Sequence, residues 1–151
     1  MREFLYECEL WVPRPRSEVF EFFADAANLQ AITPDWLDFR IETPLPIVMR
    51  AGALIDYRLK VHGIPLRWRT EILEWDPPNR FVDFQVRGPY RLWHHTHVFE
   101  DRDGGTLCRD RVRYNPPGGV LADRLLVRRD IARIFACRRE ALAARFAAGG
   151  S

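Results

Sequence analysis

Two histidines, His95 and His97, stand two residues apart in the strand-like run Leu92–Phe99. Side chains two apart on a strand point to the same face, so both imidazoles share a face with Trp93 and Phe99. A hydrophobic core has no need of two histidines, because buried polar groups require partners. If this face is buried, the row indicates a site that could bind a polar group or transfer a proton.

Carboxylates from the two neighbouring strands are expected beside these imidazoles. A short turn at Gly88–Tyr90 would place Asp83 opposite His95, and a turn around Asp103–Gly105 would place Asp110 opposite His95. The resulting face carries an acid–imidazole–acid row, in which a carboxylate orients a ring nitrogen and raises the pKa of the imidazole. The full set of expected cross-strand pairs is Gln85 with Trp93, Asp83 with His95, Phe81 with His97, Phe99 with Thr106, His97 with Cys108, and His95 with Asp110.

The row has four interpretations. It could be a structural hydrogen-bond network that fixes the sheet or orders cavity water. It could hold the polar end of a ligand, or His95 with Asp83 and Asp110 could act as an acid–base group. Alternatively, His95 and His97 could bind a metal ion, with Cys108 or Asp110 as a third ligand.

A helix is expected from Val120 to about Ala147, and it carries an anomaly of its own. Arg124 and Arg138 fall near the centre of its apolar stripe. Arg124, near the helix start, is expected to extend its guanidinium into water. Arg138 could do the same, or it could point into a cavity and pair with Asp83, Asp110 or a ligand carboxylate. The stripe consists of Val127, Ile131, Ile134, Phe135, Leu142 and Phe146.

The remaining elements define an α+β fold. Residues 3–12 alternate as a half-buried strand, a helix begins after Ser17, and a short helix covers Ala27–Ile32. Six neighbouring strands then form an antiparallel meander whose apolar face requires a cover, and the long terminal helix is the obvious one. The six strands are expected at Phe39–Glu42, Ala53–Val61, Leu66–Trp75, Phe81–Val86, Leu92–Phe99 and Thr106–Tyr114.

Composition narrows the class of protein. With 151 residues we expect one domain, residues 1–148, followed by a disordered tail at 149–151. The net charge of +2 and the absence of a basic aromatic run argue against a nucleic-acid partner. The three cysteines show no CxxC spacing, and the sequence has neither a signal peptide nor an apolar run of about 20 residues. These features predict a soluble cytoplasmic protein without a membrane span. Nucleotide-binding and hydrolase motifs are also missing, so no cofactor is expected.

Several short motifs spread over almost the whole chain carry a family resemblance. They are Ser17-Glu18-Val19-Phe20, Asn28-Leu29, Ile32-Thr33-Pro34, Gly52, Ile55-Asp56-Tyr57, Trp68, Thr70, Phe81-Val82-Asp83, Gly88-Pro89-Tyr90, Trp93, His95, His97, Phe99, Gly105-Thr106, Asp110 and Tyr114. With these motifs the sequence resembles the START/Bet v 1-like superfamily, also called SRPBCC, and within it the small bacterial ligand-binding SRPBCC proteins. That resemblance implies a helix-grip fold: a curved antiparallel sheet of about seven strands wrapped around a long carboxy-terminal helix, with two short helices after the first strand and a cavity between sheet and helix.

The resulting functional hypothesis is a binding protein for a hydrophobic or amphipathic small molecule. One alternative is an enzyme similar to polyketide cyclases and dehydratases, using His95 with Asp83 and Asp110 as acid and base. Another is a protein-interaction module with a vestigial cavity, and Leu125 and Leu126, which lie off the stripe, could then meet a second subunit. We expect a monomer or a weak homodimer. The expected ligand contacts are Tyr57, Trp68, Thr70, Asp83, Gln85, Trp93, His95, His97, Phe99, Asp110, Tyr114, Ile131, Phe135 and Arg138.

Overall fold

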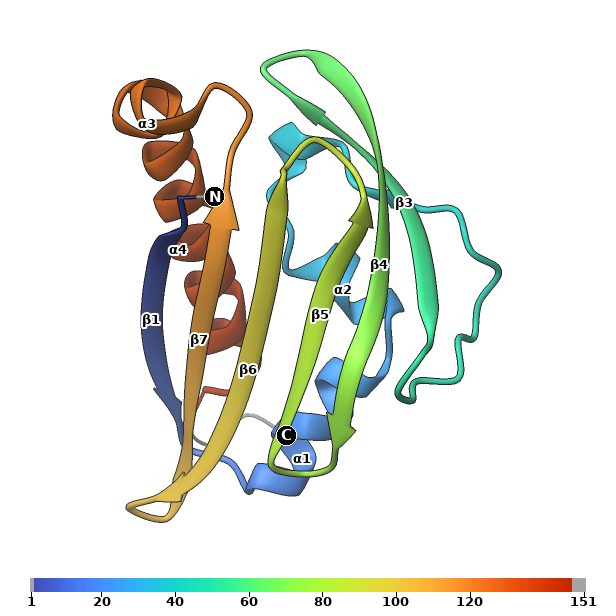
Figure 1. Cartoon of the computed structure of the whole chain (residues 1–151). Helices are drawn as coiled ribbons and strands as arrows, with labels where there is room; N and C mark the ends of the chain where they lie inside the picture. Colours follow the sequence, from blue (N-terminus) through green and yellow to red (C-terminus); the bar gives the residue numbers. More distant parts are fainter. Residues whose placement is uncertain (1, 148–151) are drawn as a thin grey trace.

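The computed structural model describes residues 2–147, so the expected tail at 149–151 lies outside the described residues. Within them, seven strands form one antiparallel sheet in the order β1-β7-β6-β5-β4-β3-β2 (Figure 1). The elements are β1 (Phe4–Val12), α1 (Arg16–Ala24), α2 (Ala27–Ala31), the 3₁₀ turn η1 (Asp35–Leu37), β2 (Arg40–Ile41), β3 (Leu54–Val61), β4 (Ile64–Asp76), β5 (Arg80–Arg87), β6 (Leu92–Arg102), β7 (Gly105–Asn115), α3 (Gly119–Ala122), the π-helical segment η2 (Asp123–Val127) and α4 (Arg128–Arg145). The expected helix-grip architecture is confirmed.

Helix α4 covers the concave face of the sheet through the predicted apolar stripe. Ile131, Phe135, Leu142 and Phe146 are each at most 5% exposed, which shows that the stripe faces the sheet. Arg124 is exposed, as expected for a residue near the helix start. Burial of these side chains holds the helix in place, since each large apolar side chain contributes about 1.5–3 kcal/mol when removed from water.

The core is divided along the length of α4. One cluster joins α1 to the carboxy-terminal end of α4 through residues such as Phe20, Phe99 and Leu142. Two further clusters lie toward the start of α4, and both have Tyr90 and Trp93 packed against them. The histidine row of β6 runs between these two ends, since it lies between Trp93 and Phe99 in the sequence.

The register of the β6–β7 hairpin differs from the expectation. His97 lies opposite Asp110, and His95 lies opposite Val112. The chain turns in two residues, Asp103 and Gly104, whose positive φ values of 49° and 76° suit a tight hairpin. The expected pairs would centre the turn between Arg102 and Asp103, one residue earlier. A shift of two residues keeps every side chain on its predicted face, so Asp110 still faces the histidines. The other two expected pairs, His97 with Cys108 and Phe99 with Thr106, are wrong for the same reason.

The β5–β6 hairpin agrees with the expectation where the two strands pair. Asp83 lies opposite His95, and Phe81 lies opposite His97. Beyond this ladder, the Gln85 amide closes the turn by donating to the Tyr90 carbonyl and accepting from the Tyr90 backbone N–H at 2.7 and 3.0 Å. A Cβ at Gly88 would come within 2.6 Å of the Gln85 side chain, so a glycine leaves room for this closure.

The long helix expected from Val120 to about Ala147 is present, and it contains a π-helical segment near its start. The chain forms α3, then the π-helical segment η2, and only then α4. Asp123, the first residue of η2, is 4% exposed and accepts a hydrogen bond of 2.6 Å from the Tyr114 hydroxyl. π-Helical turns accommodate an extra residue within a helix, and here the turn coincides with this buried bond between helix and sheet.

Candidate functional site

Asp83, His95, His97 and Asp110 meet on the concave face of the sheet as a closed ring of contacts, here called the His–Asp network. Because an ionised carboxylate can only accept, His95 Nε2–H donates to Asp110 at 2.7 Å and His97 Nε2–H donates to Asp83 at 2.6 Å. Each second ring nitrogen faces the other carboxylate, His95 Nδ1 at 3.5 Å from Asp83 and His97 Nδ1 at 3.3 Å from Asp110. Each imidazole therefore bridges both carboxylates.

The network is buried but is not sealed. The histidine side chains are 4% exposed, whereas Asp83 and Asp110 keep 19% and 18% of their side-chain surface accessible. Both carboxylates face the side of the sheet that α4 covers. Their accessible surface therefore faces space between the helix and the sheet.

The protonation preferences of the two histidines oppose each other. Burial lowers the pKa of His97, but its contacts with Asp110 and Asp83 outweigh burial and raise the pKa above the ordinary value. Burial and the neighbouring charge of His97 lower the pKa of His95 despite the two carboxylates. For Asp110, burial is outweighed by hydrogen bonds from the histidines and by their charge, which hold the pKa well below its usual value, and the pKa of Asp83 is lowered in the same way. The lowered pKa values favour ionised carboxylates, and the opposite shifts make His97 the histidine that takes up a proton first as pH falls.

Aromatic rings enclose the network on several sides. The His97 ring stacks on His95 with centroids 3.7 Å apart and on Phe81 with centroids 4.0 Å apart. Phe135 of α4 and Trp93 of β6 meet the His95 ring edge-on at 5.4 and 6.3 Å. These contacts fix the rings and exclude water, which strengthens the electrostatic interactions within the network.

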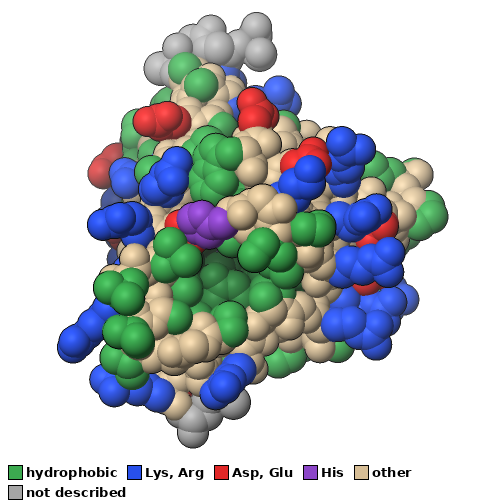
Figure 2. All heavy atoms as spheres, turned by 90° about the horizontal axis from the view of Figure 1, so that it is seen from above, with side chains coloured by type: hydrophobic (Ala, Val, Ile, Leu, Met, Phe, Trp, Pro, Cys, Tyr) green, Lys and Arg blue, Asp and Glu red, His purple; other side chains and the backbone are tan. Residues whose placement is uncertain are grey.

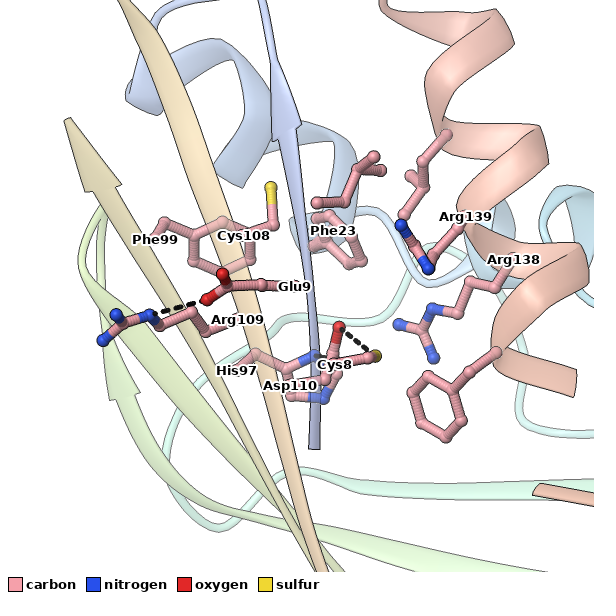
Figure 3. Close-up of a pocket in the computed structure, with 13 residues that line it drawn as sticks. Cys8, Glu9, Phe23, His97, Phe99, Cys108, Arg109, Asp110, Arg138 and Arg139 are labelled. Carbon is pink, nitrogen blue, oxygen red and sulfur yellow. Dashed lines mark hydrogen bonds and ion pairs between the residues drawn. The ribbon is translucent and has the colours of Figure 1, made fainter. Parts of the chain in front are cut away.

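Arg138 reaches from α4 toward the network (Figure 3). Its guanidinium lies over the rings of Phe23 and Phe135, 5.6 and 5.7 Å from their centroids. Its Nε is buried and has no hydrogen-bond partner among residues 2–147. The ion pair with Asp83 or Asp110 that the sequence left open is not formed within 4.0 Å in this part of the chain, where the short contacts of both carboxylates are to histidines.

A small cavity of about 10 Å³ lies beside Arg138. Its wall includes His97, Asp110, Cys8 and Cys108, and Cys8 Sγ lies 3.9 Å from Asp110 Oδ2. Such a volume suits about one water molecule. Burial and the charge of Asp110 raise the pKa of both thiols to about 12, so neither cysteine is poised as a nucleophile.

A larger depression opens at the end of the molecule where α3 and the β3–β4 turn lie. Figure 2 looks onto this end and shows a hollow lined by hydrophobic side chains. The apolar residues at this end include Val61 beside the β3–β4 turn, Tyr90 beside the β5–β6 turn, Val127 at the end of η2 and Ile134 of α4, all partly buried. We call this depression the apolar hollow. Trp93 packs with the same clusters and contacts His95, so it joins this end to the His–Asp network.

The other expected contact residues occupy several environments. Tyr57 and Thr70 share a hydrogen bond of 3.1 Å on the inner face. Trp68 stacks near Tyr57, and its buried Nε1–H has no acceptor among the described residues. Tyr114 and Ile131 are at most 1% exposed, and Gln85 is occupied by the turn, so these three serve the fold. Phe99, also expected as a ligand contact, is a core residue that lines the small cavity.

Four residues of this region were not singled out as site residues from the sequence. Cys8 and Phe23 line the small cavity, Tyr90 packs against Trp93 at 5.0 Å, and Phe81 stacks on His97. Cys8 belongs to the inward-facing set of the strand at residues 3–12, and Phe23 to the apolar stripe of the first helix, so the periodicities indicated burial. Neither signal distinguishes a cavity wall from a packed core.

A metal ion would meet a different set of atoms from the one expected. Asp83, His95 and His97 each offer a ligand atom, all within 4.8 Å of one another, and Cys108 is not part of this group. The same atoms are hydrogen-bonded between His97 and Asp83 at 2.6 Å, and the imidazole planes lie within 27° of parallel. Binding of an ion would have to separate this hydrogen bond and rotate the rings apart, since a ligand nitrogen directs its lone pair at the metal.

The fold and the buried polar site define a helix-grip protein with an ionisable centre between sheet and helix. The chain belongs to the family described as polyketide cyclase/dehydrase and lipid transport, whose model matches residues 12–143.

Solved structures support the same fold over nearly the whole chain. TTHA0849 from Thermus thermophilus is 20% identical with a TM-score of 0.77, and the match covers 98% of this chain and 100% of that one. Ms6760 from Mycobacterium smegmatis is 15% identical with a TM-score of 0.72, covering 97% and 92%. Major latex-like protein 151 from Panax ginseng is 11% identical with a TM-score of 0.71, covering 96% and 98%.

No curated protein matches this sequence. Among the described residues, none of the helices combines the length and apolar character needed to span a bilayer.

Proposed function

We propose that this protein binds an amphipathic small molecule between α4 and the concave face of the sheet. The observation that carries the proposal is the burial of four ionisable side chains in the His–Asp network, facing the helix that closes the fold. Taking ionised groups out of water is costly, and well-packed apolar residues often give equal or greater stability. A network kept here at that cost is therefore best explained by a polar group that it recognises.

The geometry offers the ligand two kinds of surface. The apolar hollow and Trp93 supply aromatic and aliphatic contact. The unsatisfied Nε1–H of Trp68 and the accessible edges of Asp83 and Asp110 supply polar contact. Ligand pockets commonly combine mostly apolar walls with a few placed polar groups, and this arrangement matches that pattern.

Native mass spectrometry of the freshly purified protein tests the proposal. The native mass should exceed the denatured mass by that of a small organic molecule, which organic solvent should extract and tandem spectrometry identify. His95→Ala should keep the fold and weaken rebinding of the extracted molecule. His94→Ala is the matched control, because His94 stands on the same strand but on the opposite face. An unchanged affinity in His95→Ala would rule out this role for the network.

A second candidate function is acid–base catalysis, as in a cyclase or dehydratase. The opposite pKa shifts of His95 and His97 favour it, because a neutral imidazole beside an imidazolium supplies both a base and an acid. Such an enzyme gives a bell-shaped pH–rate profile on a poly-β-ketone thioester, and His95→Gln abolishes turnover while binding persists. Recovery of the thioester unchanged after incubation with the protein would reject this candidate.

The interaction-module hypothesis also makes a prediction. Leu125 and Leu126 are 67% and 44% exposed, so a second copy of the chain could cover them. Sedimentation velocity over a concentration series tests whether the chain is a monomer or a weak homodimer. The cytoplasmic location stays a prediction of the sequence.

A further inference from the structure

Arg138 is the one charged side chain of α4 that lines the small cavity and also has a buried hydrogen-bond donor without a partner among the described residues. Guanidinium groups carry five N–H donors, and a buried donor left unsatisfied costs about 1–3 kcal/mol. Its contacts with the rings of Phe23 and Phe135 satisfy the charge only in part, because a cation–π contact leaves the in-plane N–H groups free. The side chain is therefore prepared for an acceptor that lies in the guanidinium plane.

The carboxylates nearest to Arg138 are already engaged. Asp83 and Asp110 accept short hydrogen bonds from His97 and His95, and Cys8 lies against the second oxygen of Asp110. At the outer edge of the small cavity, Glu9 forms an ion pair with Arg109 at 3.3 Å, so the Glu9 carboxylate already has a partner (Figure 3). The missing acceptor must then come from outside the described chain.

The charges around Arg138 also favour an acceptor from outside the described chain. With His97 protonated and His95 neutral, as the directions of their pKa shifts favour, two carboxylates and one imidazolium sum to one negative charge, and Arg138 brings the total to zero. His95 stands neutral beside them, with two carboxylates within 3.5 Å of its ring nitrogens. An added anion can therefore be balanced by protonation of His95 without leaving a net charge in the interior.

We infer that the ligand is an anionic amphiphile whose carboxylate binds Arg138, while its apolar chain extends toward the apolar hollow. A carboxylate fits because it is planar and can accept two parallel N–H bonds from one guanidinium. The small cavity beside Arg138, about 10 Å³, takes about one water molecule, so the carboxylate replaces that water and the cavity widens to admit it. The inference rests on the proposed function and specifies the chemical class of the ligand.

The test compares two probes of equal chain length, dodecanoate and dodecanol, by isothermal titration calorimetry with the full chain. The wild-type protein should bind dodecanoate about tenfold to a hundredfold more tightly than dodecanol, as expected for a charge-assisted hydrogen bond. Arg138→Gln should remove this preference. Arg138→Lys, which keeps the charge but loses the planar fork, should restore part of the preference.

Arg129→Gln is the matched control, because Arg129 is an exposed arginine on the same helix. It should behave as the wild type. Circular dichroism confirms that each variant is folded, and the lysine variant provides the test if the glutamine variant does not fold. Equal wild-type affinity for both probes, or a preference that survives in Arg138→Gln, overturns the inference and leaves the proposed function standing. Failure of the wild type to bind either probe overturns the proposed function and this inference with it.

Discussion

Replacing Asp110 with asparagine is the sharpest test of how much the His–Asp network contributes to the fold. Asp110 accepts the 2.7 Å hydrogen bond from His95 and lies 3.3 Å from a ring nitrogen of His97. Asparagine keeps the size and an oxygen that can still accept at the Oδ1 position, but it removes the negative charge that the two imidazoles face and places an amide N–H₂ where Oδ2 meets Cys8 Sγ. Removing one partner of a buried ion pair costs about 3–5 kcal/mol. Because the side chain is 18% exposed, we expect the lower end, about 3 kcal/mol.

For a chain of this length, a loss of this size lowers the melting temperature by about 6–12 °C. Urea denaturation followed by tryptophan fluorescence gives the free energy of unfolding directly. Asp56→Asn is the control, because Asp56 makes an exposed bidentate pair with Arg69 at 2.8 and 3.1 Å, and surface pairs contribute about 1 kcal/mol or less. If Asp110→Asn destabilises the protein no more than Asp56→Asn, the account of the network as a buried ionic centre is wrong.

Three further predictions follow from named contacts. Because the pKa of His97 is raised, its contribution to stability is complete below about pH 6.5 and is lost as pH rises through the folded value. His97→Gln should therefore destabilise the protein more at pH 6 than at pH 9. Equal shifts of the urea midpoint at both pH values would contradict this prediction. Tyr114→Phe removes the 2.6 Å bond to buried Asp123 and should lower the free energy of unfolding by about 2 kcal/mol in urea titrations; a loss within error of zero would show that the bond does not hold the π-helical turn. His62→Ala removes the exposed 2.8 Å contact with Asp130, which joins the β3–β4 turn to α4. The free energy of unfolding should change by less than about 1 kcal/mol, while stopped-flow uptake of dodecanoate becomes faster. An unchanged rate of uptake would show that this contact does not restrict entry of the ligand.

The fold could be predicted from the sequence because its signals are local and repeated. Alternation fixed the inner face of the strands, and the 3.6-residue period fixed the buried face of α4. The meander left no other cover for the apolar face. Even the two-residue error in the β6–β7 register did not disturb the site, since an even shift returns each side chain to the same face.

The finer geometry of the site depended on features without a local signal. The centre of the turn, between Asp103 and Gly104 or one residue earlier, decides whether His97 or His95 lies opposite Asp110, and the two glycines after Asp103 do not fix that centre from the sequence alone. The π-helical turn at Asp123 coincides with a hydrogen bond to Tyr114, which lies nine residues earlier in the chain and on another element. The stacking of Phe23 and Phe135 against Arg138 joins two helices and needs the packed structure.

A structural role for the His–Asp network and a ligand-binding role make opposite predictions for a variant in which all four groups are made apolar. Such a variant combines four substitutions of comparable volume: Asp83→Leu, Asp110→Leu, His95→Phe and His97→Phe. The new phenylalanine rings can continue the stack on Phe81. Replacing a complete buried ionic network removes its desolvation cost, whereas removing one member leaves an unpaired charge. A binding role therefore predicts that the quadruple variant unfolds at a urea concentration no lower than that of the wild type, but that it no longer rebinds the molecule extracted from the wild-type protein. The contrary outcome is a quadruple variant that fails to fold although each single apolar replacement folds. The network would then have a structural role in specifying the fold, because only interactions among the four groups could account for the loss of folding.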